Sequence, residues 1–418
     1  NFANMASLKP VRGTQDILPD ESRHFRRVEE TAYDVAERYG FGEITTPIFE
    51  FTDVFTRTLG DTSDIVTKEM YTFEDKGGDR VTLRPEGTAG VARAFISNGL
   101  QQNLPLKLFY RGPMFRYERP QKGRRRQFRQ VGIEILGVPT PQADIEAISL
   151  AETFLNELGL KDNITLELNS LGDSASRTAY RDELVNYLNG HKDKLSHDSL
   201  GRLDRNPLRI LDSKDESDRE IVANAPRLQD SLNDESRSFF AELCAGLNKL
   251  GIAFEHNTNL VRGLDYYCHT AFEFTTTDLG AQGTVLAGGR YDGLIGQMGG
   301  PETPGIGWAA GVERLTLLLD DGKEAKRPVA VIPVGGNAES EALIVAERLR
   351  KKGYKIELGY SGNLKKRMKR ANDRNAVAAI LLGEDELTRN VGTLRDMDSG
   401  EQNEVSLESL EDHLKIYK

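Results

Sequence analysis

Residues 107–137, KLFYRGPMFRYERPQKGRRRQFRQVGIEILG, constrain the fold more than any other part of this chain. Apolar and polar residues alternate along QFRQVGIEIL, which predicts a strand with one apolar face, paired with a second strand upstream. The apolar face would hold Val131, Ile133 and Ile135. The polar face would hold Gln130, Gly132 and Glu134. This pattern indicates a sheet floor with a polar ligand above it.

The loop that joins these two strands is strongly basic. Residues 119–129 contain six basic side chains and no acidic one. The upstream strand places Arg116 beside this loop. Arginine, glutamine and glutamate directed at one place suit a zwitterion together with a phosphate. The alternative is an exposed hairpin whose charges are solvated, as charge runs usually are.

Two further segments point to a ligand site. Residues 81–95, VTLRPEGTAGVARAF, predict a strand, a tight turn and a helix, with Thr88 at the N-cap position. Glu86 lies just before that position and can accept hydrogen bonds from an ammonium group. Residues 304–319 approach an apolar helix through glycines, and Arg314 in its opening turns can meet an anion. A merely capped helix is the alternative for the first segment.

The rest of the chain divides by its hydrophobic pattern. Residues 21–40 predict an amphipathic helix, and the following EITTPIFE predicts a strand in which Pro47 marks an edge or a bulge. Residues 172–257 are charged and helix-rich. After a boundary at 320–328, strands and helices alternate, which predicts a small α/β domain with a mainly parallel sheet. Its helix at 363–375 is basic.

Composition excludes several classes of protein. Two cysteines, Cys244 and Cys268, cannot form a disulfide framework or a cysteine-based zinc cluster. The six histidines are scattered, so we expect no zinc site. We expect no signal peptide and no membrane span, because no apolar run approaches about 18 residues. A reducing cytoplasm is the expected compartment. The net charge of −10 leaves local basic patches as the only candidate nucleic-acid contacts.

Taken in order, the segments resemble histidyl-tRNA synthetases, a family of class II aminoacyl-tRNA synthetases, in the bacterial form. Three segments are similar to the class II motifs: TPIFE (46–50), FRYERPQKGRRRQF (115–128) and GVERL (311–315). Three more resemble signatures of the histidine-specific branch: LRPEGT (83–88), LVRGLDYY (260–267) and GGRYDG (288–293). The resemblance runs from about Arg12 to the C-terminus.

The resemblance implies an α/β multidomain fold with an antiparallel-sheet catalytic core. It divides the chain into a first core part (1–171), a helical insertion (172–257), a second core part (258–325) and an anticodon-binding α/β domain (326–418). It also implies a homodimer formed through the helix at 21–40 and the strand after it. The alternative for this helix and strand is ordinary packing inside one core. The alternative for residues 326–418 is a generic α/β module.

The implied reaction is the ATP-dependent attachment of L-histidine to the 3′ end of tRNA(His), with histidyl-adenylate as intermediate. The resemblance assigns catalytic roles to Arg116 and Arg262, of which Arg262 would stand where other class II enzymes use a metal. ATP, bound with Mg²⁺, would meet four arginines: Arg116, Arg124, Arg262 and Arg314. Arg119 and Gln121 would lie near the acceptor end of the tRNA.

Histidine recognition is assigned by the same resemblance. The implied histidine-binding residues are Glu86, Thr88, Gln130, Glu134, Arg262, Tyr266, Tyr267 and Tyr291. A neutral imidazole offers one donor and one acceptor nitrogen, which suits a glutamate facing a tyrosine hydroxyl. The alternative for each tyrosine is a core position with a satisfied hydroxyl.

Three other functions remain as alternatives. The first is a catalytically silent relative that regulates the first enzyme of histidine biosynthesis, which usually lacks the C-terminal domain. The second is a synthetase for another amino acid, and the third is an RNA-binding module without chemistry. The presence of Arg116, Arg262 and Arg314 argues against the first, and the signatures at 260–267 and 288–293 argue against the second. An RNA-binding module would not explain Glu86, Gln130 and Glu134.

Overall fold

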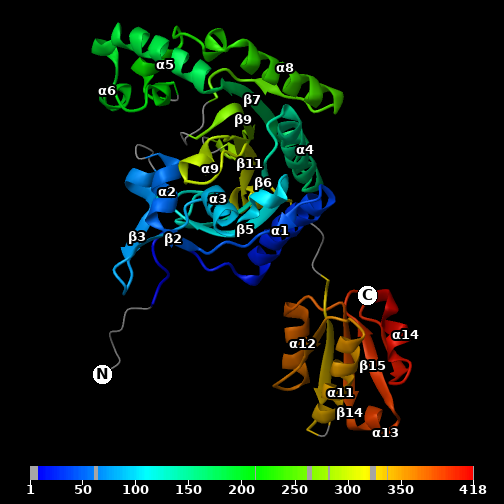
Figure 1. Cartoon of the computed structure of the whole chain (residues 1–418). Coiled ribbons are helices and arrows are strands. Elements are labelled where there is room, and N and C mark those ends of the chain that lie inside the picture. Colours follow the sequence, from blue (N-terminus) through cyan, green and yellow to red (C-terminus); the bar gives the residue numbers. More distant parts are fainter. Residues whose placement is uncertain are drawn as a thin grey trace, which may run out of the picture. The chain divides into compact units, whose positions relative to one another are not determined.

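The structure is a computed structural model of the chain, and it describes residues 8–60, 65–211, 213–260, 266–280, 283–320, 326–336 and 338–417. The chain forms two compact units, Asn1–Leu319 and Asp320–Lys418, which are described separately below (Figure 1).

The first unit is built on a large sheet, which within the described residues has eight strands in the order β1-β5-β6-β11-β10-β9-β7-β8. In that order the strands span Gly42–Glu43, Leu106–Phe115, Gln127–Leu136, Gly305–Gly311, Thr284–Arg290, Cys268–Thr275, Thr165–Gly172 and Glu255–His256. The six inner strands pair in antiparallel fashion, and only the short edge strands β1 and β8 pair in parallel. The antiparallel sheet predicted from the sequence is therefore present.

The predicted hairpin is the β5–β6 pair, which runs in register from Leu106 opposite Leu136 to Phe115 opposite Gln127. On β6 the predicted apolar face is buried in the main core of the unit: Val131, Ile133 and Ile135. The alternation with a period of two thus places the polar residues of β6 on the opposite face of the sheet.

Helices cover the apolar face of this sheet. The main ones are α1 (Pro19–Arg38), α4 (Pro141–Glu157) and the short α10 (Val312–Thr316). The ring of Trp308 on β11 stacks on Phe154 of α4 at 6.0 Å, and its Nε1 donates to the Ala147 carbonyl at 2.9 Å. The helix predicted at 21–40 is α1, which begins two residues earlier and buries Phe25, Val28, Ala32 and Val35.

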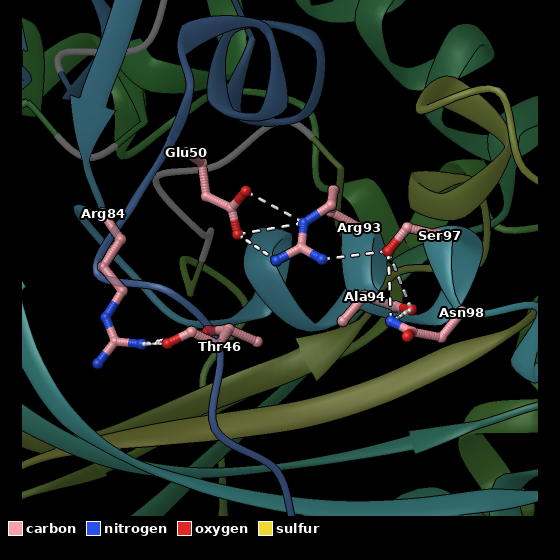
Figure 2. Close-up of polar contacts among 7 residues, drawn as sticks. All are labelled: Thr46, Glu50, Arg84, Arg93, Ala94, Ser97 and Asn98. Carbon is pink, nitrogen blue, oxygen red and sulfur yellow. Dashed lines mark hydrogen bonds and ion pairs between the residues drawn. The ribbon is translucent and has the colours of Figure 1, made fainter. Parts of the chain in front are cut away.

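The strand predicted over EITTPIFE is wrong, because the segment is split around Pro47. Only its first residue, Glu43, lies in β1 on the large sheet, and its last residues lie in β2 (Phe49–Phe51), which belongs to a separate three-stranded sheet, β2-β4-β3. Proline cannot donate to a strand ladder, so the chain leaves one sheet before it joins the other. The buried Arg84 guanidinium holds the crossing segment by donating to the Thr46 carbonyl at 3.0 Å (Figure 2).

The small sheet is completed by β3 (Tyr71–Glu74) and β4 (Arg80–Leu83), and it leads into α2 (Thr52–Leu59) and α3 (Thr88–Ser97). Figure 2 shows how the sheet is tied to α3: the Arg93 guanidinium donates to both carboxylate oxygens of Glu50. This contact fixes β2 against the helix that carries Thr88 at its start.

The helical character predicted for residues 172–257 is confirmed. The segment contains α5 (Ser174–Asn189), α6 (His197–Leu203), α7 (Glu216–Val222) and α8 (Asp234–Lys249), at the top of Figure 1. Shorter helices elsewhere in the unit are α9 (Leu294–Gln297), the π-helix at Ile65–Glu69 and 3₁₀ turns at Leu100–Asn103, Lys161–Asn163, Lys192–Lys194, Pro207–Ile210 and Leu228–Ser231. Throughout the described ranges, every helix is too short or too polar to cross a membrane.

The second unit has a five-stranded sheet in the order β13-β12-β14-β15-β16. Its elements are β12 (Val329–Val334), α11 (Ala338–Lys351), β13 (Ile356–Leu358), α12 (Leu364–Asp373), β14 (Ala378–Gly383), α13 (Glu384–Thr388), β15 (Val391–Asp396), β16 (Gln402–Ser406), α14 (Leu410–Leu414) and a 3₁₀ turn at Lys415–Tyr417. The predicted parallel core is the β13-β12-β14 part. The antiparallel hairpin β15–β16 was missed, because its residues are mostly polar or half-exposed.

A buried ion pair joins β10 to α4. The Arg290 guanidinium and the Asp144 carboxylate have no exposed surface, and Arg290 also donates to the Val138 and Thr140 carbonyls at 3.0 and 3.1 Å. Removing Asp144 leaves the buried Arg290 guanidinium with the half-buried Asp292, at 3.0 Å, as its remaining carboxylate partner among the described residues, and breaking a buried pair in this way is strongly destabilising.

We expect Asp144→Ala to lower the free energy of unfolding of the first unit by about 3–5 kcal/mol. Trp308 is the single tryptophan of the chain and lies in the core of this unit, so its fluorescence during urea denaturation reports the change. Glu43→Ala, which breaks the half-exposed pair with Arg111, is the control and should cost less than about 1 kcal/mol. Equal losses in the two variants would contradict the role given to the buried pair.

Candidate active site

A cavity of about 290 Å³ opens on the polar face of the large sheet. Strands β6, β10 and β11 contribute to its lining, together with the β5–β6 loop, the start of α3 and residues just before β9. Nine of the residues predicted for the site line it: Glu86, Thr88, Arg116, Arg124, Gln130, Tyr266, Tyr267, Tyr291 and Arg314. Segments that lie more than 200 residues apart in the sequence therefore meet at one site.

Glu134 lies directly beneath the residues that line one end of the cavity. It is 1 % exposed, and its carboxylate accepts hydrogen bonds from the Thr88 hydroxyl at 2.7 Å and from the Tyr291 hydroxyl. Burial raises the pKa of Glu134 to about 8, although both hydroxyl bonds oppose the shift and the nearby Glu86 adds to it. A carboxylate has about four lone-pair sites, so Glu134 can still accept from a ligand.

The N-cap position predicted for Thr88 is wrong. Thr88 is the first residue of α3, and the backbone N–H groups of Thr88 and Ala89 are capped by the Glu86 carboxylate at 2.6 and 2.9 Å. The Thr88 hydroxyl therefore does not cap the helix and donates instead to the Glu134 carboxylate. Burial raises the pKa of Glu86, and the two backbone bonds and the charge of Arg116 oppose that shift.

Gln130 and three tyrosines complete this end of the cavity. The Gln130 Oε1 is buried and has no hydrogen-bond partner among the described residues, so it can accept from a bound ligand. The ring of Tyr266 lies 4.5 Å from that of Tyr267 and 5.8 Å from that of Tyr291. These rings form an apolar wall of a size that suits a small planar group.

The sequence did not identify Gly307, which makes room for the buried carboxylate. A Cβ atom on this residue of β11 would lie 1.8 Å from the Glu134 Oε2, so any larger residue would displace that side chain. The glycine-rich stretch before Arg314 was the available signal. The cavity lining also contains three carboxylates that were not predicted, Glu118, Glu273 and Glu313.

The other end of the cavity is strongly basic. The Arg116 Nε donates to the Pro85 carbonyl at 2.8 Å and its guanidinium lies 5.2 Å from the Phe128 ring, while the Arg314 Nη1 donates to the Thr284 carbonyl at 2.6 Å. Burial first, and then the nearby Arg124, lowers the pKa of Arg314. Cations held this close together favour a multiply charged anion.

Several arginines of the basic loop have a structural role. Arg125 pairs with Glu21 at 2.9 Å, Arg129 pairs with Glu29, and Arg126 stacks on the Tyr117 ring at 3.8 Å. Because both glutamates belong to α1, these contacts fix the loop to that helix.

Two predicted residues of the basic loop stand apart from the cavity lining. Arg119 and Gln121 are exposed on the loop, where they can meet a macromolecule from outside. Arg262, together with the rest of residues 261–265, lies outside the described part of the chain.

Comparison with known proteins adds an independent observation. A family model described as histidyl-tRNA synthetase matches residues 13–315. The chain belongs to the histidyl-tRNA synthetase family. A second model, described as an anticodon binding domain, matches residues 328–416, so the family resemblance found in the sequence is confirmed in both units.

Relatives match along the full length of the chain. A histidine–tRNA ligase of Rhodospirillum rubrum is 66% identical over 411 residues, which cover 98% of this chain and 99% of the relative. One from Gluconacetobacter diazotrophicus is 54% identical, with the same coverage of 98% and 99%. The crystal structure of apo S. aureus histidyl-tRNA synthetase superposes with a TM-score of 0.82 at 36% identity, covering 97% of this chain and 99% of that one. The predicted fold class is thus confirmed.

Proposed function

We propose that this chain is a histidine–tRNA ligase that activates L-histidine with ATP and transfers it to the 3′ end of tRNA(His). The observation that carries the proposal is the shared cavity, where buried acceptors at one end face a group of arginines at the other. This arrangement suits an amino acid next to a nucleotide. Family membership and the names of full-length relatives support the same reaction and disfavour a silent regulatory relative.

In the first step the histidine carboxylate attacks the α-phosphorus of ATP, and pyrophosphate leaves. Arg116 would hold the α-phosphate and Arg314 the γ-phosphate, with Arg124 as a further contact. These charges are in place before the transition state forms, which is the condition for electrostatic catalysis. Arg262 is proposed to bridge the α-phosphate and the substrate carboxylate.

Histidine would bind at the other end of the cavity. Its ammonium group would meet Glu86, Thr88 and the unpartnered Oε1 of Gln130. Its imidazole would donate to Glu134 and accept from Tyr267, while Tyr266 and Tyr291 enclose the ring. An amino acid without the ring would leave these buried polar groups unpaired, and that penalty supplies the selectivity.

ATP would enter with Mg²⁺. Within the described ranges, no group of three or more His, Cys, Asp or Glu side chains is arranged to hold a metal ion alone. The ion would be held mainly by phosphates and water, with Glu118 and Glu273, two of the carboxylates that line the cavity, as candidate protein contacts, and it would neutralise phosphate charge.

The assignment of the whole chain is tested by aminoacylation with radiolabelled histidine. We expect labelled product with tRNA(His) and none with a tRNA of different identity. Product with neither RNA would remove the transfer step from the proposal. We propose the cytoplasm as the compartment, because the substrates ATP and tRNA are found there.

The proposed domain roles follow the boundaries expected from the sequence: core at 1–171 and 258–325, insertion at 172–257 and anticodon binding at 326–418. The match of 328–416 to an anticodon-binding model supports the last of these. The insertion would approach the acceptor arm of the tRNA.

Arg119 is proposed to contact the acceptor end, with Gln121 beside it. Because Arg119 is exposed and does not line the cavity, we expect Arg119→Ala to lower aminoacylation about tenfold and to leave adenylate formation unchanged. Single-turnover assays separate the two steps. An equal loss in both would contradict the assignment.

A homodimer is proposed because the small sheet has an uncovered aromatic face. Phe51 and Phe73 both lie opposite Val81 of β4, so they share a face, and their exposures are 60% and 48%. The neighbouring Phe49 is 52% exposed. Exposed apolar patches of this kind mark interaction surfaces, and the second copy is the partner that family membership suggests.

We expect Phe51→Glu to weaken the dimer roughly a hundredfold, because it places a charge at the centre of an apolar contact. Analytical ultracentrifugation measures the dissociation constant. Leu343→Glu is the matched control, since Leu343 is 54% exposed but belongs to the second unit. A wild-type chain that sediments as a monomer would contradict the proposal.

A further inference from the structure

The two longest helices of the insertion begin at one shared polar junction. The Asp173 carboxylate caps α5 by accepting from the Ser176 N–H at 2.7 Å, and it also accepts from the Asn233 side chain at 2.6 Å. Asn233 in turn caps α8 by accepting from the Ser236 N–H at 2.8 Å. Ser176 and Ser236 are buried. The starts of α5 and α8 therefore form one rigid assembly.

This junction is attached to the strand that leads out of the histidine end of the cavity. Gly172, just before Asp173, pairs with His269 at the start of β9. From the first turn of α5, the Arg177 Nη1 donates to the Tyr267 carbonyl at 2.6 Å. Tyr267 is one of the residues whose side chain lines the cavity.

A second contact comes from α8. The Phe239 ring stacks on the His269 ring with centroids 4.6 Å apart and planes inclined by 22°. The Phe239 ring also lies 5.1 Å from the guanidinium of Arg290. Arg290 directly precedes Tyr291, whose hydroxyl bonds Glu134. The insertion thus contacts the backbone of Tyr267 directly and the residue that precedes Tyr291 in the chain.

We propose that Arg177 is a positioning residue for histidine selection, and that the helical insertion is structurally part of the amino-acid site. The inference rests on the proposed function, in which Tyr267 meets the imidazole. A charged guanidinium on the Tyr267 carbonyl fixes the backbone from which that side chain projects. Small displacements of a binding group have large effects on recognition, so loss of this bond should act on histidine and not on ATP.

The test compares Arg177→Met with Arg181→Met in ATP–pyrophosphate exchange. Arg181 is exposed one turn further along α5, so its variant removes the same charge without touching the cavity wall. We expect Arg177→Met to raise the KM for histidine about tenfold and to change the KM for ATP by less than about twofold. Arg177→Lys, which keeps a charged donor, should recover part of the histidine affinity. Arg181→Met should match the wild type.

Three results would overturn the inference: a histidine KM in Arg177→Met equal to that of Arg181→Met, a parallel rise in both KM values, or no recovery with lysine. If Arg177→Met does not fold, Phe239→Leu carries the same test, with the same histidine-specific rise expected. A wild-type chain that shows no exchange with histidine would instead refute the proposed function, and the inference would fall with it.

Discussion

Arg116→Ala should lower ATP–pyrophosphate exchange with histidine by about 10²–10³-fold. The guanidinium of Arg116 is held by the Pro85 carbonyl and by the Phe128 ring, so its position is set before substrates bind. Negative charge develops on the α-phosphate during adenylation, and a fixed cation there stabilises the transition state more than the ground state. The loss should therefore appear in kcat and in kcat/KM alike.

The control for Arg116→Ala is Arg111→Ala. Arg111 lies on β5, the strand that ends one residue before Arg116, but it pairs with Glu43 at 2.9 Å and does not line the cavity. We expect this variant to retain activity within about twofold, since surface substitutions rarely perturb a distant site. Arg116→Lys should be intermediate, because lysine keeps the charge but not the planar fork. Normal exchange in a folded Arg116→Ala chain would contradict the assignment.

We expect histidine binding to the wild type to depend on pH, and we expect Glu134→Gln to remove that dependence. Burial raises the pKa of Glu134 to about 8, so at neutral pH the carboxyl of the empty site is largely protonated. The ionised form is the acceptor that the imidazole N–H needs, and binding below this pKa must first expel a proton. The KM for histidine should therefore rise roughly eightfold as the pH falls from about 8.5 to about 7.

In Glu134→Gln the same pH change should leave the KM for histidine nearly constant and high. The KM for ATP serves as the internal control, because Glu134 does not face the phosphate end. Folding should not suffer: a buried acid with a raised pKa makes the native state less stable as pH rises between its unfolded and folded values, and glutamine removes that effect. A wild-type histidine KM that is flat over this range would contradict the role given to Glu134.

The sequence predicted those parts of the fold that local patterns determine. Alternation along β6 placed Val131 in the core and Gln130 at the cavity, because side chains of a strand must alternate between faces. The periodicity of α1 was equally informative, since its buried positions follow the helical repeat. Local chemistry also indicated that Pro47 would disturb a strand, but not that the chain would change sheets there.

The remaining features depend on contacts between distant segments. No local pattern indicates that Arg129 is neutralised by Glu29 of α1, or that Gly307 makes space for Glu134. The hairpin β15–β16 escaped prediction for a related reason: β15 joins the sheet by pairing with β14, which is distant information, and the residues of β16 are mostly polar and exposed. Such features become visible only when the chain is folded.

Selective activation of histidine is tested most directly by ATP–pyrophosphate exchange with each of the twenty amino acids in turn, without tRNA. We expect exchange with histidine alone, because only the imidazole can pair with the buried acceptors and donors at the end of the cavity. Exchange with a different amino acid, or with none from a folded chain, would contradict this expectation.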